Sequence, residues 1–347
     1  MSVDQGPIRV GIAGLGRSGW NIHARLLEPL VDKYRIVAVC DLLASRREEA
    51  EERLDCRSYE RYEDMLLDKQ VELVVVALPS QLHPSYTIQA LRAGKHAISE
   101  KPMATRLADA DAMIAAAQKA NRTLSAFQNR RYAQDFVQVK RVIDSGVLGR
   151  IVLIRLAWQS YSRRWDWQTL TKFSGGTLNN TCPHALDQVL QLYNGVIPEV
   201  TMHMERTLTL GDANDHIKFV FRAPDGPMID LEVTSCCAYP QDDWMVMGTN
   251  GTLTGSSRAL KWKYINPADL EPREVDIRST PDRSYNREAY NWTEETWDIS
   301  QSADPGQVGY YLDLYETLRN GAPLSVTPAS VRPQVAILER AWNEFHM

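Results

Sequence analysis

A glycine-rich turn near the N-terminus constrains the fold more than any other feature of this sequence. The apolar run IRVGIAG leads into AGLGRSG, and a helical pattern from about residue 18 to residue 31 follows. In a Gly-x-Gly-x-x-Gly turn the glycines allow a tight bend, a close approach of a pyrophosphate and close packing of helix on strand. The helix N-terminus offers free N–H groups to the phosphates. The turn predicts a dinucleotide site formed by Gly14, Leu15, Gly16, Arg17, Ser18 and Gly19.

The end of the next apolar run supports this prediction and bears on the choice of cofactor. RIVAVC is followed by Asp41, at the distance at which a carboxylate binds the adenosine ribose diol. A carboxylate there repels a 2′-phosphate, so we expect NAD and regard NADP as a weaker candidate. Arg46 and Arg47 could soften this preference, but a solvent-exposed helix face shared with Glu48 and Glu49 is the favoured interpretation.

The pattern of apolar runs indicates two domains in this chain of 347 residues. Up to residue 127, continuous β-branched runs alternate with helical stretches, which is typical of a parallel sheet covered by helices. Beyond that point strands follow strands, which indicates an antiparallel sheet with one covered face. We expect an α/β Rossmann domain over residues 1–127. An α+β domain on a large, mostly antiparallel open sheet is expected over residues 128–347.

A lysine is expected beside the cofactor. The run HAIS is followed directly by Glu100, Lys101 and Pro102. Ligands of open α/β sheets bind outside the carboxyl ends of the strands, so topology places Lys101 near a dinucleotide. From these residues alone, a surface lysine before a turn is an equally good interpretation.

A lone histidine in the second domain is a candidate base. PHALDQVLQLYNG predicts a helix with Pro183 and His184 in its first turn. A helix N-terminus disfavours positive charge, which would lower the imidazole pKa and keep His184 neutral, as a general base requires. Asp187 is expected on nearly the same face, where it could orient the ring. A polar residue that merely fills the turn is the alternative.

Several segments together resemble a known family. GIAGLGRSGW, ALPSQLHPSYTIQALRAGKHAISEKPMA, FQNRRY and GGTLNNTCPHALD occur in the order found in the Gfo/Idh/MocA family (glucose–fructose oxidoreductase, inositol dehydrogenase and MocA-type proteins). The resemblance covers nearly the whole chain. It implies a nicotinamide-dependent oxidoreductase acting on hydroxyl groups of sugars, inositols or related polyols. It also implies a homodimer or homotetramer assembled through the open face of the second sheet.

The resemblance assigns roles to individual residues. Lys101 matches the lysine that hydrogen-bonds the substrate hydroxyl and the nicotinamide ribose, and His184 matches the catalytic histidine. Many members carry an aspartate where this chain has Asn180, which can hold a substrate hydroxyl but cannot ionise. Asp187 completes the catalytic set expected here.

Further positions match the loops around the cofactor and the substrate. Pro79 and His83 match a loop beside the cofactor, although a histidine followed by proline is also typical of a helix start. We also expect Glu100, which precedes Lys101, among the residues of the cofactor site. Asn129 and Arg130, in FQNRRY, match the crossover that faces the substrate pocket, and Asn129 is also expected at the cofactor.

The loop before the histidine segment carries arginines and tryptophans. Trp165 and Asp166 are candidate substrate-binding residues, because aromatic faces and forked donors suit carbohydrates. The same composition suits a subunit interface equally well.

Charge and composition argue against other classes of partner. The net charge is −5, with acidic and basic residues mixed along the chain, which does not favour nucleic acid or an anionic membrane. No apolar run approaches the ~20 residues of a membrane span, and MSVDQGPIRVGIAG does not resemble a signal peptide. Five scattered cysteines favour a reducing, cytoplasmic setting without a metal site.

Two other functions remain open from the sequence. The cofactor could oxidise a sugar hydroxyl only transiently, as in a redox-neutral NAD-dependent glycosidase or epimerase. Alternatively, the chain could be a non-catalytic NAD-binding regulator, although such a sensor would not need both Lys101 and His184.

Overall fold

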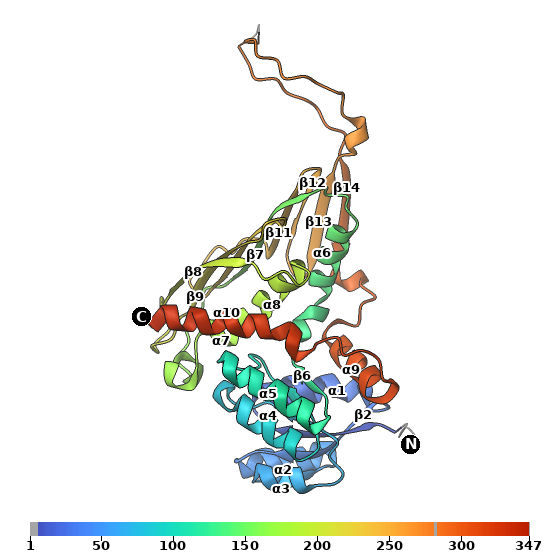
Figure 1. The fold of residues 1–347 in the computed structure, drawn as a ribbon, viewed down its shortest axis with the longest axis vertical. Helices are drawn as coiled ribbons and strands as arrows, with labels where there is room; N and C mark the ends of the chain where they lie inside the picture. The colour runs from blue at the N-terminus through green and yellow to red at the C-terminus, as the bar shows by residue number, and fades with distance from the viewer. Residues whose placement is uncertain (1–5, 281–282, 347) are drawn as a thin grey trace.

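Two β-sheets organise the chain in the computed structural model, which describes residues 6–280 and 283–346. The first five residues of the N-terminal stretch interpreted above lie outside the described residues. The first sheet forms the lower part of the molecule in Figure 1, and the second forms the upper part. The expected combination of a Rossmann domain with a mostly antiparallel open sheet is confirmed.

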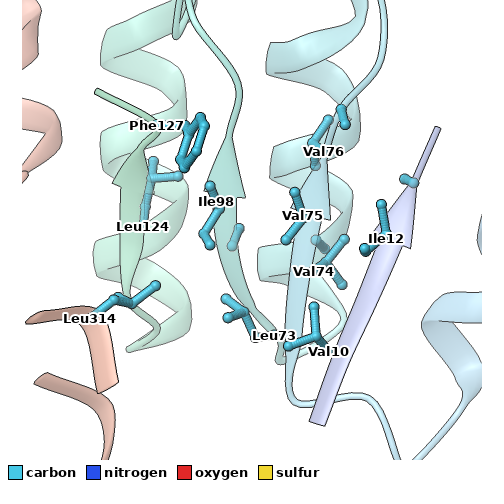
Figure 2. Packing of buried hydrophobic residues seen from close by; sticks show 14 of the residues in the cluster. Val10, Ile12, Leu73, Val74, Val75, Val76, Ile98, Leu124, Phe127 and Leu314 are labelled. Carbon is cyan, nitrogen blue, oxygen red and sulfur yellow. The ribbon is translucent and has the colours of Figure 1, made fainter. Parts of the chain in front are cut away.

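The first sheet has six parallel strands in the order β3-β2-β1-β4-β5-β6. Its strands are β1 (Ile8–Ala13), β2 (Tyr34–Cys40), β3 (Arg57–Tyr59), β4 (Leu73–Val76), β5 (His96–Ser99) and β6 (Leu124–Ala126). Its helices include α2 (Ala44–Leu54), α3 (Tyr62–Leu67), α4 (His83–Arg92) and α5 (Leu107–Ala120). All four residues of β4 are buried, because helices cover both faces of the sheet. Figure 2 shows how β-branched side chains of β1, β4 and β5 fill this core.

The helix after the glycine turn differs from expectation. Residues Gly19–Ala24 form a π-helix, α1 (Arg25–Leu27) follows, and a 3₁₀ turn covers Glu28–Leu30. π-Helical turns inside helices occur often at functional sites. Here the π-helix carries His23, which is fully buried and contacts Glu100.

The second sheet has eight strands in the order β14-β13-β12-β11-β7-β10-β9-β8. They are β7 (Ile151–Gln159), β8 (Glu199–Glu205), β9 (His216–Arg222), β10 (Met228–Thr234), β11 (Trp244–Gly248), β12 (Gly251–Gly255), β13 (Ala259–Tyr264) and β14 (Thr293–Asp298). The β7–β10 pair is parallel, and the other neighbours are antiparallel. Inward and outward residues alternate along β9 and β10, as expected for a sheet with one covered face.

Helices cover one face of this sheet. These helices are α6 (Gln134–Asp144), α7 (Thr177–Asn180), α8 (Cys182–Leu192) and the end of α10 (Pro328–His346). Leu186 and Val189 of α8 are fully buried in this second core. The other face carries charged pairs such as Lys218–Asp230, whose Nζ and Oδ1 atoms lie 2.6 Å apart. In residues 6–280 and 283–346 no helix is both long and apolar enough to span a membrane.

The C-terminal helices return to the first sheet. The helix α9 (Gly309–Asn320) and the first half of α10 place Tyr311, Leu314 and Val331 in the core of the Rossmann sheet. Figure 1 shows α10 lying between the two sheets. The C-terminal segment formed by α9 and α10 therefore packs against both halves of the molecule.

Two glycines of the turn make different demands on the structure, which gives a matched test. A Cβ on Gly19 would overlap the carbonyl oxygen of Gly14, whereas a Cβ on Gly16 would meet no atom within 4 Å. We expect Gly19→Ala to lower the free energy of unfolding by about 1–3 kcal/mol through overpacking. Gly16→Ala should stay within about 0.5 kcal/mol of the wild type. Urea unfolding without cofactor measures both, and equal stabilities of the two variants would contradict this packing.

Candidate active site

The glycine turn is fixed to the end of the neighbouring strand. Gly14 has a φ of 91°, in the region that favours glycine. Its N–H donates to the carbonyl of Cys40 at 2.8 Å, and the N–H of Leu15 donates to the carboxylate of Asp41, also at 2.8 Å. The turn and Asp41 therefore lie together at the carboxyl edge of the first sheet.

Arg46 is exposed to solvent as expected, whereas Arg47 is not, and both arginines contact Asp41. Arg46 donates to the Asp41 carboxylate at 3.3 Å, and Arg47 donates to the Asp41 backbone carbonyl at 2.8 Å. The side chain of Arg47 is mostly buried and also pairs with Glu60. Because Arg46 partly neutralises Asp41, the carboxylate opposes a 2′-phosphate less strongly than the sequence indicates.

His83 holds two loops together. Its Nδ1 lies 2.8 Å from the carbonyl oxygen of Pro102, and its Nε2 lies 2.8 Å from that of Leu78. The side chain is buried, and burial lowers its pKa. His83 begins α4, and Pro79 precedes a 3₁₀ turn over Ser80–Leu82. The histidine thus connects the Pro79 loop to the peptide after Lys101 while its ring nitrogens face backbone oxygens.

Glu100 faces the protein interior. One carboxylate oxygen lies 3.2 Å from Nε2 of His23, and the other accepts the N–H of Lys101 at 2.9 Å. The Nδ1 of His23 in turn lies 2.7 Å from the hydroxyl of Tyr311. Burial alone would raise the pKa of Glu100, but His23 and Lys101 outweigh it and lower the pKa to about 2. Glu100 is therefore an anion committed to internal partners that fix the backbone of Lys101.

Lys101 reaches from the first sheet to the histidine segment. The Lys101–Pro102 peptide is cis, and Nζ donates to the backbone carbonyl of Asn180 at 2.7 Å. Burial lowers the pKa of Lys101, and the charges of Arg17 and Arg130 lower it further, against the opposing effect of Glu100. This contact joins Lys101 to Asn180, two residues expected at the catalytic site that are 79 positions apart in the chain.

His184 carries an unused ring nitrogen. Its Nδ1 is buried and has no hydrogen-bond partner within the described part of the chain. Burial lowers the pKa of His184 well below its ordinary value, and the charges of Lys101 and Arg130 act in the same direction. The imidazole is therefore neutral at physiological pH.

The cause of that neutrality differs from the one expected. His184 lies in the first turn of α8, but α7 runs almost directly into it through Thr181, whose φ of −100° and ψ of −42° are helical. A helix start that continues a preceding helix exposes few free N–H groups. Desolvation and neighbouring cations, not the helix N-terminus, therefore dominate the pKa.

Asp187 does not contact the ring of His184, which corrects the expectation that it orients the imidazole. Its two carboxylate oxygens each accept a hydrogen bond from Arg131 at 2.7 Å. Both side chains are almost fully buried, and Arg131 also donates to Ser330 of α10 at 3.0 Å. This ion pair ties the crossover after the Rossmann sheet to α8, one turn from His184.

Buried amides complete the junction between the domains. Gln188 of α8 donates to the carbonyl of Arg130 at 2.9 Å. Gln334 of α10 accepts from Gln128 at 2.8 Å and donates to the carbonyl of Pro183, the residue before His184. The start of α8 is therefore bonded to α10 through Gln334, and the middle of α8 is bonded to the crossover through Gln188.

The crossover residues have different surroundings. Asn129 is buried and donates to Gln307, while its Oδ1 has no partner in the described residues. Arg130 is half-buried, and its guanidinium lies over the ring of Trp158, 5.8 Å from the centroid.

A cavity of about 330 Å³ opens beside Arg130, at the ends of β7 and β10. Thr177, Thr181 and Gln188 line it, and His184 lies at the same helical spacing between the last two. Its other walls include Trp158, Gln159, Thr234 and Ser235. The cavity is thus polar, with one aromatic face.

Trp165 and Asp166, two candidate substrate-binding residues, do not line this cavity, and neither do Lys101, Asn180 and His184. Trp165 is 75% exposed. Asp166 binds Arg164 through two hydrogen bonds of 2.9 Å and caps the 3₁₀ turn Trp167–Thr169. Trp158 is the aromatic residue that lines the cavity, and it carries no signal in the sequence because it lies within an ordinary strand pattern.

Comparison with known proteins identifies the family. Residues 8–128 match the oxidoreductase family GFO_IDH_MocA with its NAD-binding Rossmann fold, and residues 136–254 match the GFO/IDH/MocA C-terminal domain. The chain belongs to this family. It is accordingly an oxidoreductase with a binding domain for a nicotinamide cofactor.

Individual members of the Gfo/Idh/MocA family extend this comparison. The scyllo-inositol 2-dehydrogenase (NADP(+)) IolW of Bacillus subtilis is 33% identical over 345 residues, covering 96% of this chain and 92% of the relative. An inositol 2-dehydrogenase of Salmonella typhimurium is 30% identical, covering 68% of this chain and 69% of the relative.

Solved structures share the fold. The oxidoreductase yvaA of Bacillus subtilis superposes with a TM-score of 0.83 at 24% identity, covering 100% of this chain and 97% of that chain. The WlbA dehydrogenase of Bordetella pertussis, solved with NADH and UDP-GlcNAcA, superposes with a TM-score of 0.78 at 24% identity. It covers 98% of this chain and 96% of that chain.

The buried ion pair gives a prediction for this member of the family. Asp187→Asn leaves the Arg131 charge buried and should lower the free energy of unfolding by about 3–5 kcal/mol. Replacing both partners with apolar residues, Arg131→Met with Asp187→Leu, should recover much of that loss. Asp144→Asn is the control, because Asp144 makes only an exposed pair with Lys140. Urea unfolding compares the variants, and equal stability of Asp187→Asn and Asp144→Asn would contradict the assignment.

Proposed function

We propose that this protein is an NAD-dependent dehydrogenase of a secondary hydroxyl in a sugar, an inositol or a related polyol. The observation that carries the proposal is the contact between a half-buried lysine at the carboxyl edge of the first sheet and the segment that carries a neutral histidine. Nζ of Lys101 donates to the carbonyl of Asn180, which precedes His184 by four residues, and the charge of Lys101 helps to lower the pKa of His184. Inositol dehydrogenases among the relatives support the class of substrate.

The residues of the glycine turn fit a dinucleotide. The backbone at Gly16 is open, since a Cβ there would meet no protein atom within 4 Å. Residues Gly14–Gly19 hold the pyrophosphate, with Arg17 as an added cation, and Asp41 accepts from the adenosine ribose. The nicotinamide, when bound, accepts the hydride from the carbinol carbon. We favour NAD over NADP because of Asp41, although Arg46 lessens that preference.

The protein's own residues handle the proton and the oxygen. His184 takes the hydroxyl proton at a ring nitrogen, and Lys101 donates a hydrogen bond to the same oxygen as negative charge develops. Asn180 holds a neighbouring hydroxyl, while Asn129 and Arg130 contact the substrate from the crossover. Glu100 and His83 act on these groups through the backbone around Lys101, and Asp187 acts through its ion pair with the side chain of Arg131.

The open face of the second sheet supports assembly of two or four copies. Charged side chains on this face pair with one another, as Lys218 does with Asp230. The same face of another copy can therefore pack on it without leaving these charges unpaired. We propose a homodimer or homotetramer formed through this face, in a cytoplasmic protein.

Removal of the base tests the function directly. We expect His184→Ala to lower kcat/KM for polyol oxidation by roughly 10²–10⁴-fold, because the hydroxyl proton loses its acceptor. The assay follows NADH formation with hexoses, inositols and sugar acids, using NAD and NADP. His203→Ala is the control, since His203 lies exposed on β8, where its side chain contacts Glu205 and the ring of His216. Near wild-type oxidation by His184→Ala would refute the base assignment. Tightly held cofactor without net NADH would favour the redox-neutral alternative.

The pH dependence follows from the direction of the His184 shift. A base works only when neutral, and the pKa of His184 lies well below its ordinary value of 6.5. Activity should therefore persist below pH 6.5 and fall only as the pH drops through this lowered pKa. The acid limb of kcat/KM for oxidation measures it, and a limb above 6.5 would contradict the burial of the imidazole.

A further inference from the structure

One guanidinium beside the reacting groups has no anionic partner. Within residues 6–280 and 283–346, the side chain of Arg130 makes no hydrogen bond or ion pair and only stacks over Trp158. Its neighbour Arg131 is fully engaged by Asp187, and Arg164 is engaged by Asp166. Stacking uses the face of a guanidinium and leaves its N–H edges available. Those edges adjoin the cavity at the ends of β7 and β10.

The charges around the reacting groups are mostly positive. Lys101, Arg17 and Arg130 all act on His184, and Glu100 opposes them. Glu100 is committed to His23 and the Lys101 backbone, and Asn180 carries no charge. The charges that act most strongly on His184 are therefore mainly cations, which attract an anion.

Two carboxylates on the cavity wall do not remove this imbalance. Asp135 is buried and accepts the indole N–H of Trp244 at 2.9 Å, and burial raises its pKa. Asp243 accepts the N–H of Ser257 at 2.7 Å at the exposed rim. Neither forms an ion pair with Arg130 in the described structure, so its forked donors are available for a ligand.

We propose that Arg130 binds a carboxylate of the substrate, so that the preferred polyol is a sugar acid such as a uronate or aldonate. This inference rests on the proposed polyol oxidation and adds the charge of the substrate to it. A guanidinium and a carboxylate match in a planar, two-bonded geometry. The hydroxyl groups of Thr177, Thr181 and Thr234 and the amide of Gln188 can bind the remaining sugar oxygens.

Substrates that differ only in charge test this inference. Initial rates of NADH formation are compared for glucuronate with glucose and for galacturonate with galactose. We expect kcat/KM at least about 10-fold higher for the acid in at least one pair. Arg130→Gln should lower kcat/KM for that acid by roughly 10- to 100-fold, mainly through KM, and should lower kcat/KM for the neutral sugar by a clearly smaller factor. Arg258→Gln is the control, because Arg258 is exposed on the turn before β13.

A binding measurement separates this inference from the proposed function. In the presence of NADH, glucuronate or galacturonate should raise Tm of the wild type more than the matching neutral sugar does, and Arg130→Gln should abolish the difference. If no polyol is oxidised but this pattern holds, the dehydrogenase proposal fails and carboxylate recognition stands. Equal kcat/KM and equal Tm shifts for acids and neutral sugars would overturn the inference. An equal loss of both substrates in Arg130→Gln would overturn it as well.

Discussion

The buried ion pair between Arg131 and Asp187 is the constraint on which the site depends. It joins the crossover after β6 to α8, the helix that carries His184, and both partners are nearly inaccessible to water. A pair of this kind adds little net stability compared with apolar packing, but it tolerates only one geometry. That geometry fixes the position of α8, which carries His184, relative to the first sheet, which carries Lys101. The Gln128–Gln334–Pro183 chain reinforces the same position from α10.

Electrostatic interactions set the protonation states that the proposed chemistry needs. Burial and the neighbouring cations keep His184 neutral, while Glu100 remains ionised because His23 and Lys101 surround it. The negative charge of Glu100 thus stays in the protein interior, bonded to His23 and to the backbone of Lys101. The charges of Lys101, Arg17 and Arg130 act on the side of the site that carries His184. A site of this kind suits an alkoxide that forms as the proton and hydride leave. It also has a place for a permanent anion at Arg130.

The sequence predicts well those features that depend on local spacing. The glycine turn, Asp41, Lys101 and His184 each follow or begin an element recognisable from its own residues, and the structure joins Lys101 to the segment of His184. It predicts poorly what depends on pairs distant in the chain. The spacing of three residues predicts that Asp187 meets His184, yet the partner of Asp187 lies 56 positions away. The π-helix that carries His23, and Gln334 on the last helix, give no local signal because only tertiary contacts explain them.

The central claim is that hydride passes from a substrate carbinol to the nicotinamide while this site takes the proton. A polyol that the enzyme turns over, deuterated at the reacting carbon, tests it in a single turnover with NAD. The account predicts slower cofactor reduction than with the undeuterated polyol, with the label recovered in the released NADH. Label that returns to the sugar product, or never reaches the nicotinamide, would contradict net dehydrogenation by Lys101 and His184.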